Sequence, residues 1–493
     1  MYKLNKTQKL VDIIFNYADK QGDKIAIIDH LTHRKISYST LKHFVFAGCE
    51  YLQRCSVSKG NCVIISASNT LEFVVAYLSV HCIGAIAVPI DSSTSQERIE
   101  LLKDITNASL ILTGNYKSSK LYRMISEIIE NESDCEYNKI KKIDIDDAAD
   151  LLFTSGVTGD PKGVILTHRN IISAATNINE FTRINESDKE LLALPLCHSF
   201  GLGRMRCVLM KGATLVLYNG FAQLKKIFNI FEEYSITGFS LVPAAWRTIY
   251  RMAGDYIKKY SLQLNYIELG SAPMTTAEKQ CLAEILPETR ICMHYGLTEA
   301  SRSTFLEFHD DMEHLGSVGR ESPNVNVSIV NKSTNHETGY EEGEIKICGD
   351  HVMAGYFNNV LLSSNGLENN CFFTEDYGYL DEDGYLYLIG REKELINVGG
   401  RKVSPVEVEN ILIQAAGVDE VACVGHADEI LGEVVVAFVV SSYDNKSELE
   451  KRIIQYAKSK MEYYKVPSFI MFTDSIPKTE SGKVTRNLLK SMV

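Results

Sequence analysis

Short apolar segments alternate with longer amphipathic segments in the first part of the chain. Apolar runs at residues 62–66, 86–90 and 110–112 have the length and composition of buried strands. Helical patterns lie between them, at residues 71–81 and 97–103. Strands that alternate with helices in this way predict a parallel sheet in an α/β fold.

The alternation continues into the middle of the chain. We expect strands at residues 148–153, 191–195, 214–217, 238–243, 266–269 and 291–294, and a helix at residues 169–182. Several of these strands run into loops that are rich in Gly, Ser and Thr. Open α/β sheets bind ligands outside the carboxyl ends of their strands. The pattern therefore predicts a ligand site formed by these loops.

The pattern changes after about residue 316, where helical segments between strands stop. Short strands with turn signals at residues 325–330, 343–348 and 384–389 predict an antiparallel, barrel-like piece. The C-terminal part is typical of an α+β domain, with a helix from Ser404-Pro405, a strand at 434–440 and a helix at 446–460. Proline suits a first helical turn. We expect a domain boundary near residue 391.

The loop after residues 148–153 has the composition of a phosphate-binding loop. Its glycines and donors include Thr154, Ser155, Gly156, Thr158, Gly159 and Lys162. Glycine lets several backbone N–H groups point towards one anion, and the hydroxyls and the lysine add donors and charge. It is not a Walker A loop, because G-x-x-x-x-G-K-[ST] is absent and Pro161 precedes the lysine. Taken alone, this composition suits a solvated turn equally well.

Length and charge narrow the class of protein. At 493 residues the chain exceeds what one hydrophobic core usually covers, so two or more domains are expected. It is 45% hydrophobic and 23% charged, as ordinary globular proteins are. The net charge of −12 argues against nucleic acid as the main partner. An anionic nucleotide stays possible, because its binding depends on local loops.

The cysteines and the apolar runs indicate a compartment. The chain has 12 cysteines and no C-x-x-C pair, which argues against zinc and against a disulfide framework. Reduced thiols in a reducing compartment are the expectation. The N-terminal residues lack the apolar core of a signal peptide, and the longest aliphatic run, residues 434–440, is too short to span a bilayer. We expect a cytoplasmic protein.

Four polar residues outside the glycine-rich loop are candidates for chemistry. Glu299, next to Thr298, has a carboxylate that suits a magnesium ion. Asp376 can accept hydrogen bonds from ribose hydroxyls, and Arg391 can donate to the sugar or to a phosphate. Lys483 is a point charge in a Ser-Gly-Lys turn. Each also has an ordinary explanation as a solvated surface charge.

Five ordered motifs together resemble the adenylate-forming superfamily of acyl- and aryl-CoA synthetases, adenylation domains of nonribosomal peptide synthetases and firefly luciferases. They lie at residues 154–163, 295–299, 374–376, 390–391 with 397–409, and 477–483. The match to the family covers nearly the whole chain. Two residues depart from the family pattern. Val157 stands where the loop usually has Ser or Thr, and Glu375 replaces the glycine of T-G-D.

The resemblance implies a fold and a motion. It implies an α/β protein with a large N-terminal AMP-binding domain (residues 1–390) of two α/β subdomains and a small β-barrel. A small mobile α+β domain (residues 391–493) follows. This domain would rotate about Lys393, which matches the family's hinge. Rotation would remove Lys483 from the cleft and bring Gly399 and Gly400 towards a thiol tunnel.

The resemblance also implies two half-reactions that use ATP, Mg²⁺ and CoA. A carboxylate attacks the α-phosphorus of ATP, and a thiol then attacks the acyl carbon so that AMP leaves. The loop residues, with magnesium on Glu299, would surround the phosphates, and Thr298 and Lys483 would act at the reacting groups. The implied adenine site comprises Tyr295 and Gly296 on one side and Gly270, Ser271 and Ala272 on the other.

The residue type at the strand end near His198 indicates which class of carboxylic acid to expect. Amino-acid adenylation domains usually carry an Asp there, whereas acyl- and aryl-CoA synthetases carry a His beside an aromatic gate. His198 therefore favours an acid without an α-amino group, unless it is only a packed histidine. The expected acyl pocket is mostly apolar and comprises Ser240, Leu241, Val242, Gly270, Leu297, Ser301 and Arg302. Arg302 either points to solvent or recognises a second polar group.

Three functions remain open on the sequence. The main hypothesis is a ligase that joins a fatty or aryl carboxylic acid to CoA. The second is a ligase that loads the phosphopantetheine of an acyl carrier protein. The third is a non-catalytic nucleotide-binding protein, disfavoured because Lys483, Glu299 and Asp376 are all present. Luciferase-like oxygenation has no independent support.

Overall fold

The computed structural model describes residues 9–114, 122–129, 142–155, 161–334, 339–359, 366–478 and 484–493. The chain divides into two compact units. The first comprises Met1–Val327 and Ile347–Phe372, and the second comprises Ser328–Lys346 and Phe373–Val493. The domain boundary expected near residue 391 stays a prediction.

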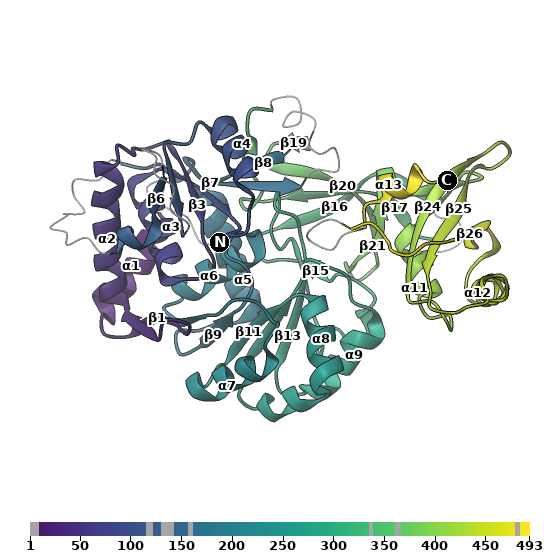
Figure 1. Cartoon of the computed structure of the whole chain (residues 1–493), viewed down its shortest axis with the longest axis horizontal. Coiled ribbons are helices and arrows are strands. Elements are labelled where there is room, and N and C mark those ends of the chain that lie inside the picture. Colours follow the sequence, from purple (N-terminus) through teal and green to yellow (C-terminus); the bar gives the residue numbers. More distant parts are fainter. Residues whose placement is uncertain are drawn as a thin grey trace. The chain divides into compact units, whose positions relative to one another are not determined.

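The first unit contains a mixed sheet with the strand order β15-β14-β13-β12-β11-β9-β10-β1-β2 (Figure 1). Its strands are β1 (Ile25–Asp29), β2 (Arg34–Ser37), β9 (Lys189–Leu192), β10 (Thr214–Leu217), β11 (Gly238–Leu241), β12 (Tyr266–Leu269), β13 (Arg290–Tyr295), β14 (Thr304–Glu307) and β15 (Arg320–Glu321). The pairs from β13 through to β1 are parallel, and β2, β14 and β15 pair antiparallel. The α/β fold predicted from the alternating pattern is confirmed.

Helices connect the parallel strands of this sheet. They are α6 (Ser199–Met210), α7 (Leu224–Tyr234), α8 (Pro243–Ala253) and α9 (Thr276–Ile285). Figure 1 shows α7, α8 and α9 on one side of the sheet and α6 on the other. Strand β10 lies beside one edge of β9 and β11 beside the other, so the strand order reverses between β9 and β11. Ligands of open α/β sheets bind at such a reversal, outside the carboxyl ends of the strands.

A second sheet of the same unit has the strand order β18-β8-β7-β4-β3-β5-β6. Its strands are β3 (Cys62–Ser66), β4 (Ile86–Ile90), β5 (Leu110–Thr113), β6 (Tyr122–Met124), β7 (Ala148–Ser155), β8 (Pro161–Thr167) and β18 (Gly355–Tyr356). Buried side chains such as Ile64, Val88 and Ile111 form its core. Strand β8 was not predicted, and it makes the phosphate-binding loop the turn of a β7–β8 hairpin.

Further helices of this unit lie within the described residues. They are α1 (Leu10–Lys20), α2 (Tyr38–Arg54), α3 (Leu71–Ile83), α4 (Gln96–Thr106) and α5 (His168–Thr182). Helix α3 is apolar around almost its whole circumference and is buried accordingly. Its N-cap, Thr70, accepts a hydrogen bond from the Phe73 N–H, and it ends at Gly84 with a φ of 75°. Among the described residues, no helix has the length and the apolar character that crossing a membrane requires.

A further sheet has the strand order β16-β17-β20-β19, with β21 paired to β20. Its strands are β16 (Asn326–Thr334), β17 (Glu341–Cys348), β19 (Leu367–Glu368), β20 (Cys371–Leu380) and β21 (Leu386–Arg391). Strand β20 pairs antiparallel with β19 and with β21. This sheet stands where the sequence predicts an antiparallel piece.

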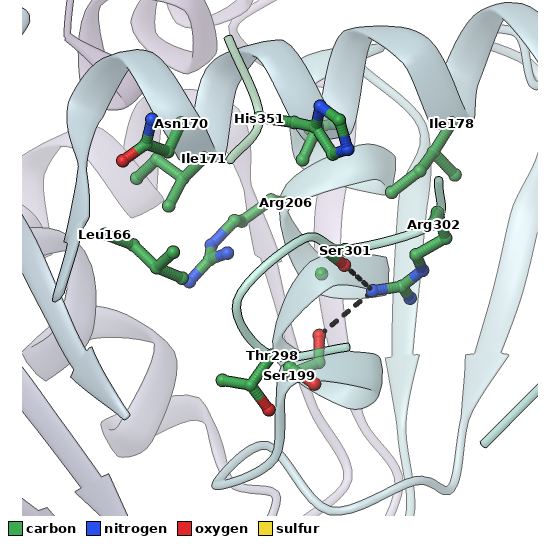
Figure 2. A pocket seen from close by; sticks show the side chains of 13 residues that line it. Leu166, Asn170, Ile171, Ile178, Ser199, Arg206, Thr298, Ser301, Arg302 and His351 are labelled. Carbon is green, nitrogen blue, oxygen red and sulfur yellow. Dashed lines mark hydrogen bonds between the residues drawn. The ribbon is translucent and has the colours of Figure 1, made fainter. Parts of the chain in front are cut away.

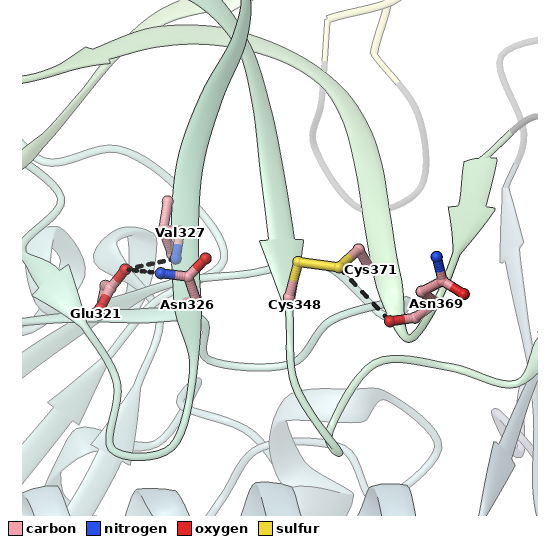
Figure 3. The surroundings of a disulfide bond; sticks show 6 residues. All are labelled: Glu321, Asn326, Val327, Cys348, Asn369 and Cys371. Atoms are coloured by element: carbon pink, nitrogen blue, oxygen red, sulfur yellow. Dashed lines mark hydrogen bonds between the residues drawn. A yellow bond between two sulfur atoms is a disulfide. The ribbon is translucent and has the colours of Figure 1, made fainter.

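Cys348 and Cys371 form a disulfide, so the expectation that the cysteines are reduced is wrong for this pair (Figure 3). Cys348 is the last residue of β17 and Cys371 the first of β20, which is its neighbour in the sheet. Their Cα atoms are 4.0 Å apart although 23 residues separate them along the chain. Strand pairing creates this proximity, and cysteine spacing therefore contains no sign of it.

The second unit contains an α+β core. Its sheet has the order β23-β22-β25-β24, with β26 parallel to β25. The strands are β22 (Ile396–Val398), β23 (Arg401–Val403), β24 (Glu420–Asp428), β25 (Gly432–Val440) and β26 (Phe469–Phe472), and the helices are α11 (Pro405–Leu412), α12 (Lys446–Lys460) and α13 (Arg486–Lys490). Val408, Val435 and Leu449 are among its buried side chains. The elements predicted near residues 404, 434–440 and 446–460 are confirmed.

Candidate functional site

Four loops follow strands that end at one edge of the first sheet. Leu241 of β11 pairs with Leu269 of β12, and Leu269 pairs with Met293 of β13. The residues after these strand ends, among them Val242 and Gly270, therefore lie at the same edge. Strand β9 ends at the same level, because its Leu191 pairs with Phe239 of β11. This is the edge at which the strand order reverses.

His198 occupies the N-cap position of α6, at the end of the loop that follows β9. Its side chain is exposed. The alternative of a packed strand-end histidine is therefore wrong, and the imidazole is accessible at the carboxyl edge of the sheet. The loop that follows β13 is half-buried from Tyr295 to Glu299, which is the exposure expected of a ligand-lining segment.

Two glycines allow the loops at this edge to approach each other. A Cβ at Gly270 would lie 2.1 Å from the His294 ring, and one at Gly296 would lie 2.4 Å from the backbone nitrogen of Arg302. Neither position has room for a side chain. Ser271 and Ala272, after Gly270, are exposed. The predicted adenine walls, Tyr295 and residues 270–272, thus follow adjacent strands.

The phosphate-binding loop lies at the turn of the β7–β8 hairpin. Thr154 pairs with Lys162, and the Thr154 hydroxyl donates to the Lys162 carbonyl at 3.5 Å. Gly156, Val157, Thr158 and Gly159 lie outside the described residues, as does the side chain of Ser155. Lys162 is half-buried at the start of β8. The hairpin therefore places Lys162 opposite Thr154, another residue of the predicted phosphate-binding loop.

Tyr356 connects the hairpin to Glu299. Its hydroxyl donates a hydrogen bond of 2.8 Å to Glu299 Oε1, and the Lys162 Nζ lies 6.0 Å from the centroid of its ring. Two residues predicted at separate phosphate contacts are thus brought to one side chain. Tyr356 was missed from the sequence, because it lies 57 positions from Glu299 and belongs to none of the motifs.

Backbone hydrogen bonds hold this arrangement together. The Met353 N–H donates to the Glu299 carbonyl at 2.8 Å. The Ala354 N–H donates to Ile165 at 2.9 Å, and the Phe357 N–H donates to Gly163 at 2.8 Å. Residues 353–357 therefore join the loop of Glu299 to strand β8. The position of Glu299 relative to Lys162 is set by main-chain bonds as well as by Tyr356.

Glu190, Arg204, Glu268 and Arg302 form a buried ionic cluster under this edge of the sheet. Arg204 donates to Glu190 at 2.9 Å and to Glu268 at 2.7 Å, and Arg302 donates to Glu268 at 3.1 Å. Two carboxylates thus balance two guanidinium groups. Arg204 and both carboxylates are 0% exposed, and Arg302 is 3% exposed.

Arg302 and Ser240, two residues of the expected acyl pocket, belong to this polar layer. Arg302 also donates to the carbonyls of Ser199 and Phe200, at 3.1 and 3.0 Å. It therefore does not point to solvent, and its donors are taken by protein atoms. The Ser240 hydroxyl donates to Glu190 at 2.9 Å. The acyl pocket itself stays a prediction, and two of its expected residues, Ser240 and Arg302, bond to buried carboxylates.

The arginines of the ionic cluster keep Glu268 charged, and the pKa of His294 beside it is also shifted. Burial alone would raise the pKa of Glu268, but Arg302 and Arg204 hold that pKa well below its ordinary value. Glu268 is therefore ionised. Burial lowers the pKa of His294, whose Nδ1 lies 2.8 Å from Glu268 Oε1, although Glu268 opposes the shift.

A small cavity lies between α5, α6 and the loop that contains Thr298 (Figure 2). Its volume is about 20 Å³. Its walls are formed by Leu166, Asn170, Ile171, Ala174, Ala175, Ile178, Ser199, Gly203, Arg206, Thr298, Ser301, Arg302 and His351. Figure 2 shows Arg302 bonded to Ser301 and Ser199 on one side of it. A cavity of this size holds about one water molecule.

His351, in the wall of this cavity, makes the stability of the first unit depend on pH. Its Nε2 lies 3.1 Å from the Ser303 hydroxyl, and burial lowers its pKa from 6.5 to about 4. The unfolded chain therefore binds more protons between these values. We expect stability to fall as the pH drops from 6.5 towards 4, by about 1.4 kcal/mol per pH unit for this group.

Chemical denaturation at several pH values measures this effect. His351→Asn should reduce the pH dependence, whereas His43→Asn, at an exposed position, should leave it unchanged. The pKa of His168, which burial lowers to about 3, adds a slope of the same sign in all three proteins. An identical pH dependence in wild type and His351→Asn would contradict the assignment.

Asp376 and Arg391 face each other on neighbouring strands of the second unit. Asp376 of β20 pairs with Arg391 of β21, and the Arg391 Nε lies 3.1 Å from Asp376 Oδ1. Glu375, which departs from T-G-D, has a φ of 58° and lies 2.6 Å from the Nζ of the predicted hinge residue Lys393. The residue that replaces glycine therefore keeps a left-handed backbone and adds an ion pair at the hinge position.

Gly399 and Gly400 form the turn between β22 and β23. Both have positive φ, 60° and 84°, as a two-residue turn of this kind requires. Both are exposed. Lys483 lies outside the described residues, between Lys478 and Val484, which form an isolated antiparallel bridge.

A candidate magnesium site can be tested against the donor set. Within the described part of the chain, no group of three or more His, Cys, Asp or Glu side chains could hold a metal ion. Magnesium does not require one, because it usually takes one or two carboxylates together with phosphate oxygens and water. Glu299, half-buried near Lys162 and held by Tyr356, fits that requirement.

The chain is similar to known proteins over most of its length. The family model for AMP-binding enzymes matches residues 14–357, and that for the AMP-binding enzyme C-terminal domain matches residues 407–483. The chain is 30% identical to 4-coumarate-CoA ligase 1 of Narcissus pseudonarcissus, over 97% of this chain and 92% of that protein. It is 27% identical to the long-chain-fatty-acid–CoA ligase FadD13 of Mycobacterium tuberculosis, over 94% of each.

A solved structure resembles the chain along its whole length. The o-succinylbenzoate CoA synthetase MenE from Bacillus subtilis, in complex with the acyl-adenylate intermediate, has a TM-score of 0.87 and is 26% identical, covering 99% of each chain. The same enzyme has been solved in complex with ATP and a magnesium ion, with a TM-score of 0.85, 26% identity and coverage of 97% of this chain and 99% of that one.

Proposed function

Because the chain belongs to the family of AMP-binding enzymes, we propose that it is an AMP-forming acid–CoA ligase. It activates a fatty or aryl carboxylic acid with ATP and then joins the acyl group to the thiol of CoA. The observation that carries this proposal is the similarity to CoA ligases over nearly the whole chain. The meeting of Lys162 and Glu299 at Tyr356 supports it independently.

The first half-reaction places one anion against another. A carboxylate oxygen forms a bond to the α-phosphorus, and the bond from that phosphorus to pyrophosphate breaks. Positive charge and oriented donors must therefore stand where negative charge builds up. Lys162 and the predicted donors of the glycine-rich loop would surround the phosphates, and Glu299 would hold magnesium, which would neutralise phosphate charge. The proposal assigns the Thr298 hydroxyl to the reacting groups.

The second half-reaction forms the carbon–sulfur bond. The CoA sulfur attacks the acyl carbon, and the bond from that carbon to AMP breaks. The proposal assigns His198, exposed at the N-terminus of α6, to the passage between the acid and the thiol. It assigns the ribose to Asp376 and Arg391, and the thiol tunnel to Gly399 and Gly400. Residues 391–493 would change position between the half-reactions by rotation at Lys393.

ATP–pyrophosphate exchange over a panel of short, medium, long-chain and aryl acids tests the first half-reaction. We expect exchange above background with at least one acid. Background exchange with every acid, from protein that binds ATP, would indicate a nucleotide-binding protein without this chemistry. Offering free CoA and a phosphopantetheinylated acyl carrier protein after adenylate formation decides between the two thiols.

A cytoplasmic location is part of the proposal, and cell fractionation tests it.

Lys483→Ala and Lys393→Pro are expected to separate the half-reactions. Lys483→Ala removes a charge from the reacting groups and should lower adenylate formation about 10²–10³-fold, as loss of one stabilising donor does. Thioester formation from supplied acyl-adenylate should survive. Lys393→Pro restricts backbone rotation at the hinge, so it should slow thioester formation while adenylate formation survives. Single-turnover assays of each step measure both, and equal losses in the two steps would count against the assignment.

A further inference from the structure

The buried ionic cluster limits the size of the acid, and this inference rests on the proposed function. If the carboxylate of the acid is held near Thr298 and His198, as the proposed function assigns it, the remaining carbons would extend below the strand edge. One direction runs between α6 and the ends of β11, β12 and β13. Another runs between α5 and α6, where the small cavity lies. The contents of these two spaces decide which acids fit.

The ionic cluster fills the first space. The Arg302 guanidinium spans from Glu268 on β12 to the first turn of α6, where it bonds to Ser199 and Phe200. It also lies 4.8 Å from the centroid of the Phe200 ring. Phe200 in turn contacts His294, with ring centroids 4.7 Å apart. A continuous layer of side chains therefore crosses the space from the helix to the sheet.

The glycines around this layer show how tightly it is packed. A Cβ at Gly203 of α6 would lie 2.6 Å from Arg302 Nη1. A Cβ at Gly238 of β11 would lie 2.3 Å from the Tyr266 hydroxyl, which donates to Glu190 at 2.5 Å. Together with the Cβ position at Gly270, these contacts leave no room for one added carbon at three points around the layer.

The second space, the small cavity between α5 and α6, is too small for an acyl chain. Its polar wall residues are held in place by hydrogen bonds and ion pairs. At about 20 Å³ it accommodates a water molecule, whereas sites for drug-sized ligands have roughly 300–1,000 Å³. Arg206 in its wall donates to the Tyr77 hydroxyl at 2.8 Å and is ion-paired with buried Asp150. Asp150 also lies 2.8 Å from the His81 ring nitrogen. These bonds oppose an outward shift of Arg206.

The ionic cluster also resists displacement. Moving Arg302 aside would take one of two guanidinium groups from Glu268 and bare the carbonyls of Ser199 and Phe200. Leaving buried charges and carbonyls without partners is expensive in a protein interior. An alkyl chain that entered would gain only the burial of its own methylene groups. The side chains of the cluster therefore stay in place and keep the space between α6 and the strand ends occupied.

We propose that this enzyme activates a short-chain carboxylic acid, and that Arg302 is the residue that excludes longer and aromatic acids. The conclusion is narrower than the range of a fatty or aryl acid ligase. It follows from the occupied space between α6 and the strand ends. Arg302 acts on specificity by filling volume, and it need not touch the reacting atoms.

Exchange assays of the wild-type protein with acetate, butyrate, octanoate, palmitate and cinnamate test the proposal directly. We expect the kcat/KM for butyrate or acetate to exceed that for octanoate and cinnamate at least about 100-fold, because each misplaced methylene changes such ratios about 10–200-fold. Octanoate or cinnamate activated as well as butyrate would overturn the inference but leave the proposed function intact. Exchange with none of the acids would remove the function on which the inference rests.

Arg302→Ala tests the residue itself. It opens the space beside Gly203, while Glu268 keeps its bond to Arg204. The ratio of octanoate to butyrate activity should rise at least about tenfold. Arg247→Ala, which removes an exposed arginine paired with Glu278, is the matched control and should keep the wild-type ratio. A folded Arg302→Ala protein with an unchanged ratio would refute the role of Arg302.

Binding of non-hydrolysable adenylates gives a readout without turnover. Thermal shifts with acetyl- and octanoyl-sulfamoyl adenosine should favour the acetyl compound in the wild type, and Arg302→Ala should reduce that preference. If Arg302→Ala does not fold, the wild-type comparison of the two compounds still decides the matter. Equal stabilisation of the wild type by both compounds would contradict the proposal that the ionic cluster excludes longer acids.

Discussion

Replacing Arg204 with leucine is expected to lower the free energy of unfolding of the first unit by about 3–5 kcal/mol. The substitution removes the guanidinium that bonds to both Glu190 and Glu268 and leaves these carboxylates buried. Urea denaturation followed by tryptophan fluorescence measures the loss. Trp246 is the only tryptophan of the chain, and it is 2% exposed in α8 of the first unit.

Arg247→Leu is the matched control for this experiment. Arg247 also bonds to a carboxylate, Glu278, but both side chains are partly exposed. Its loss should cost at most about 1 kcal/mol, as for other surface ion pairs. A loss no larger than that of Arg247→Leu would show that the cluster is not essential.

Glu299→Gln is expected to lower the kcat/KM of adenylate formation about 10²–10³-fold, because it removes the carboxylate assigned to magnesium at the phosphates. Tyr356→Phe keeps that carboxylate and removes only the hydrogen bond that orients it. Partners of this kind typically contribute 10–100-fold to metal affinity or activity. We therefore expect the smaller loss for Tyr356→Phe, and a higher magnesium concentration should restore most of it.

Exchange assays over a range of magnesium concentrations measure both effects, and calorimetric titration with Mg·ATP gives an independent value. Tyr250→Phe, at an exposed position of α8, is the control for loss of a tyrosine hydroxyl. Unchanged magnesium dependence in Tyr356→Phe would show that the hydrogen bond to Glu299 has no part in metal binding. Full activity of Glu299→Gln would remove Glu299 from the site.

Local patterns predicted many elements of this fold. Helix α12 was expected at residues 446–460 and forms at Lys446–Lys460, because its amphipathic pattern and the cap at Asn445 act within the helix itself. Strands β3 and β4 were expected from apolar runs and form at the same residues. Strand β8 was missed, because it starts at a proline beside a glycine-rich loop and owes its extended form to pairing with β7.

The candidate site shows the same limit. Motif residues such as Glu299 and Lys162 were singled out because their chemistry and order are visible along the chain. Tyr356 was not, since its hydrogen bond to Glu299 arises only when β18 pairs with β8. The alternatives for Arg302 could not be resolved either, because its partners Glu268, Ser199 and Phe200 come from two other elements.

The sequence by itself determined the α/β alternation, the motifs and the family, because these depend on residue type and on spacing along the chain. Only the tertiary structure decided that Cys348 and Cys371 are joined, that Arg302 is buried in an ionic cluster, and that Tyr356 contacts both Lys162 and Glu299. These features are contacts between segments far apart in sequence. Strand pairing and helix packing bring such segments together, and the linear order of residues contains no direct record of them.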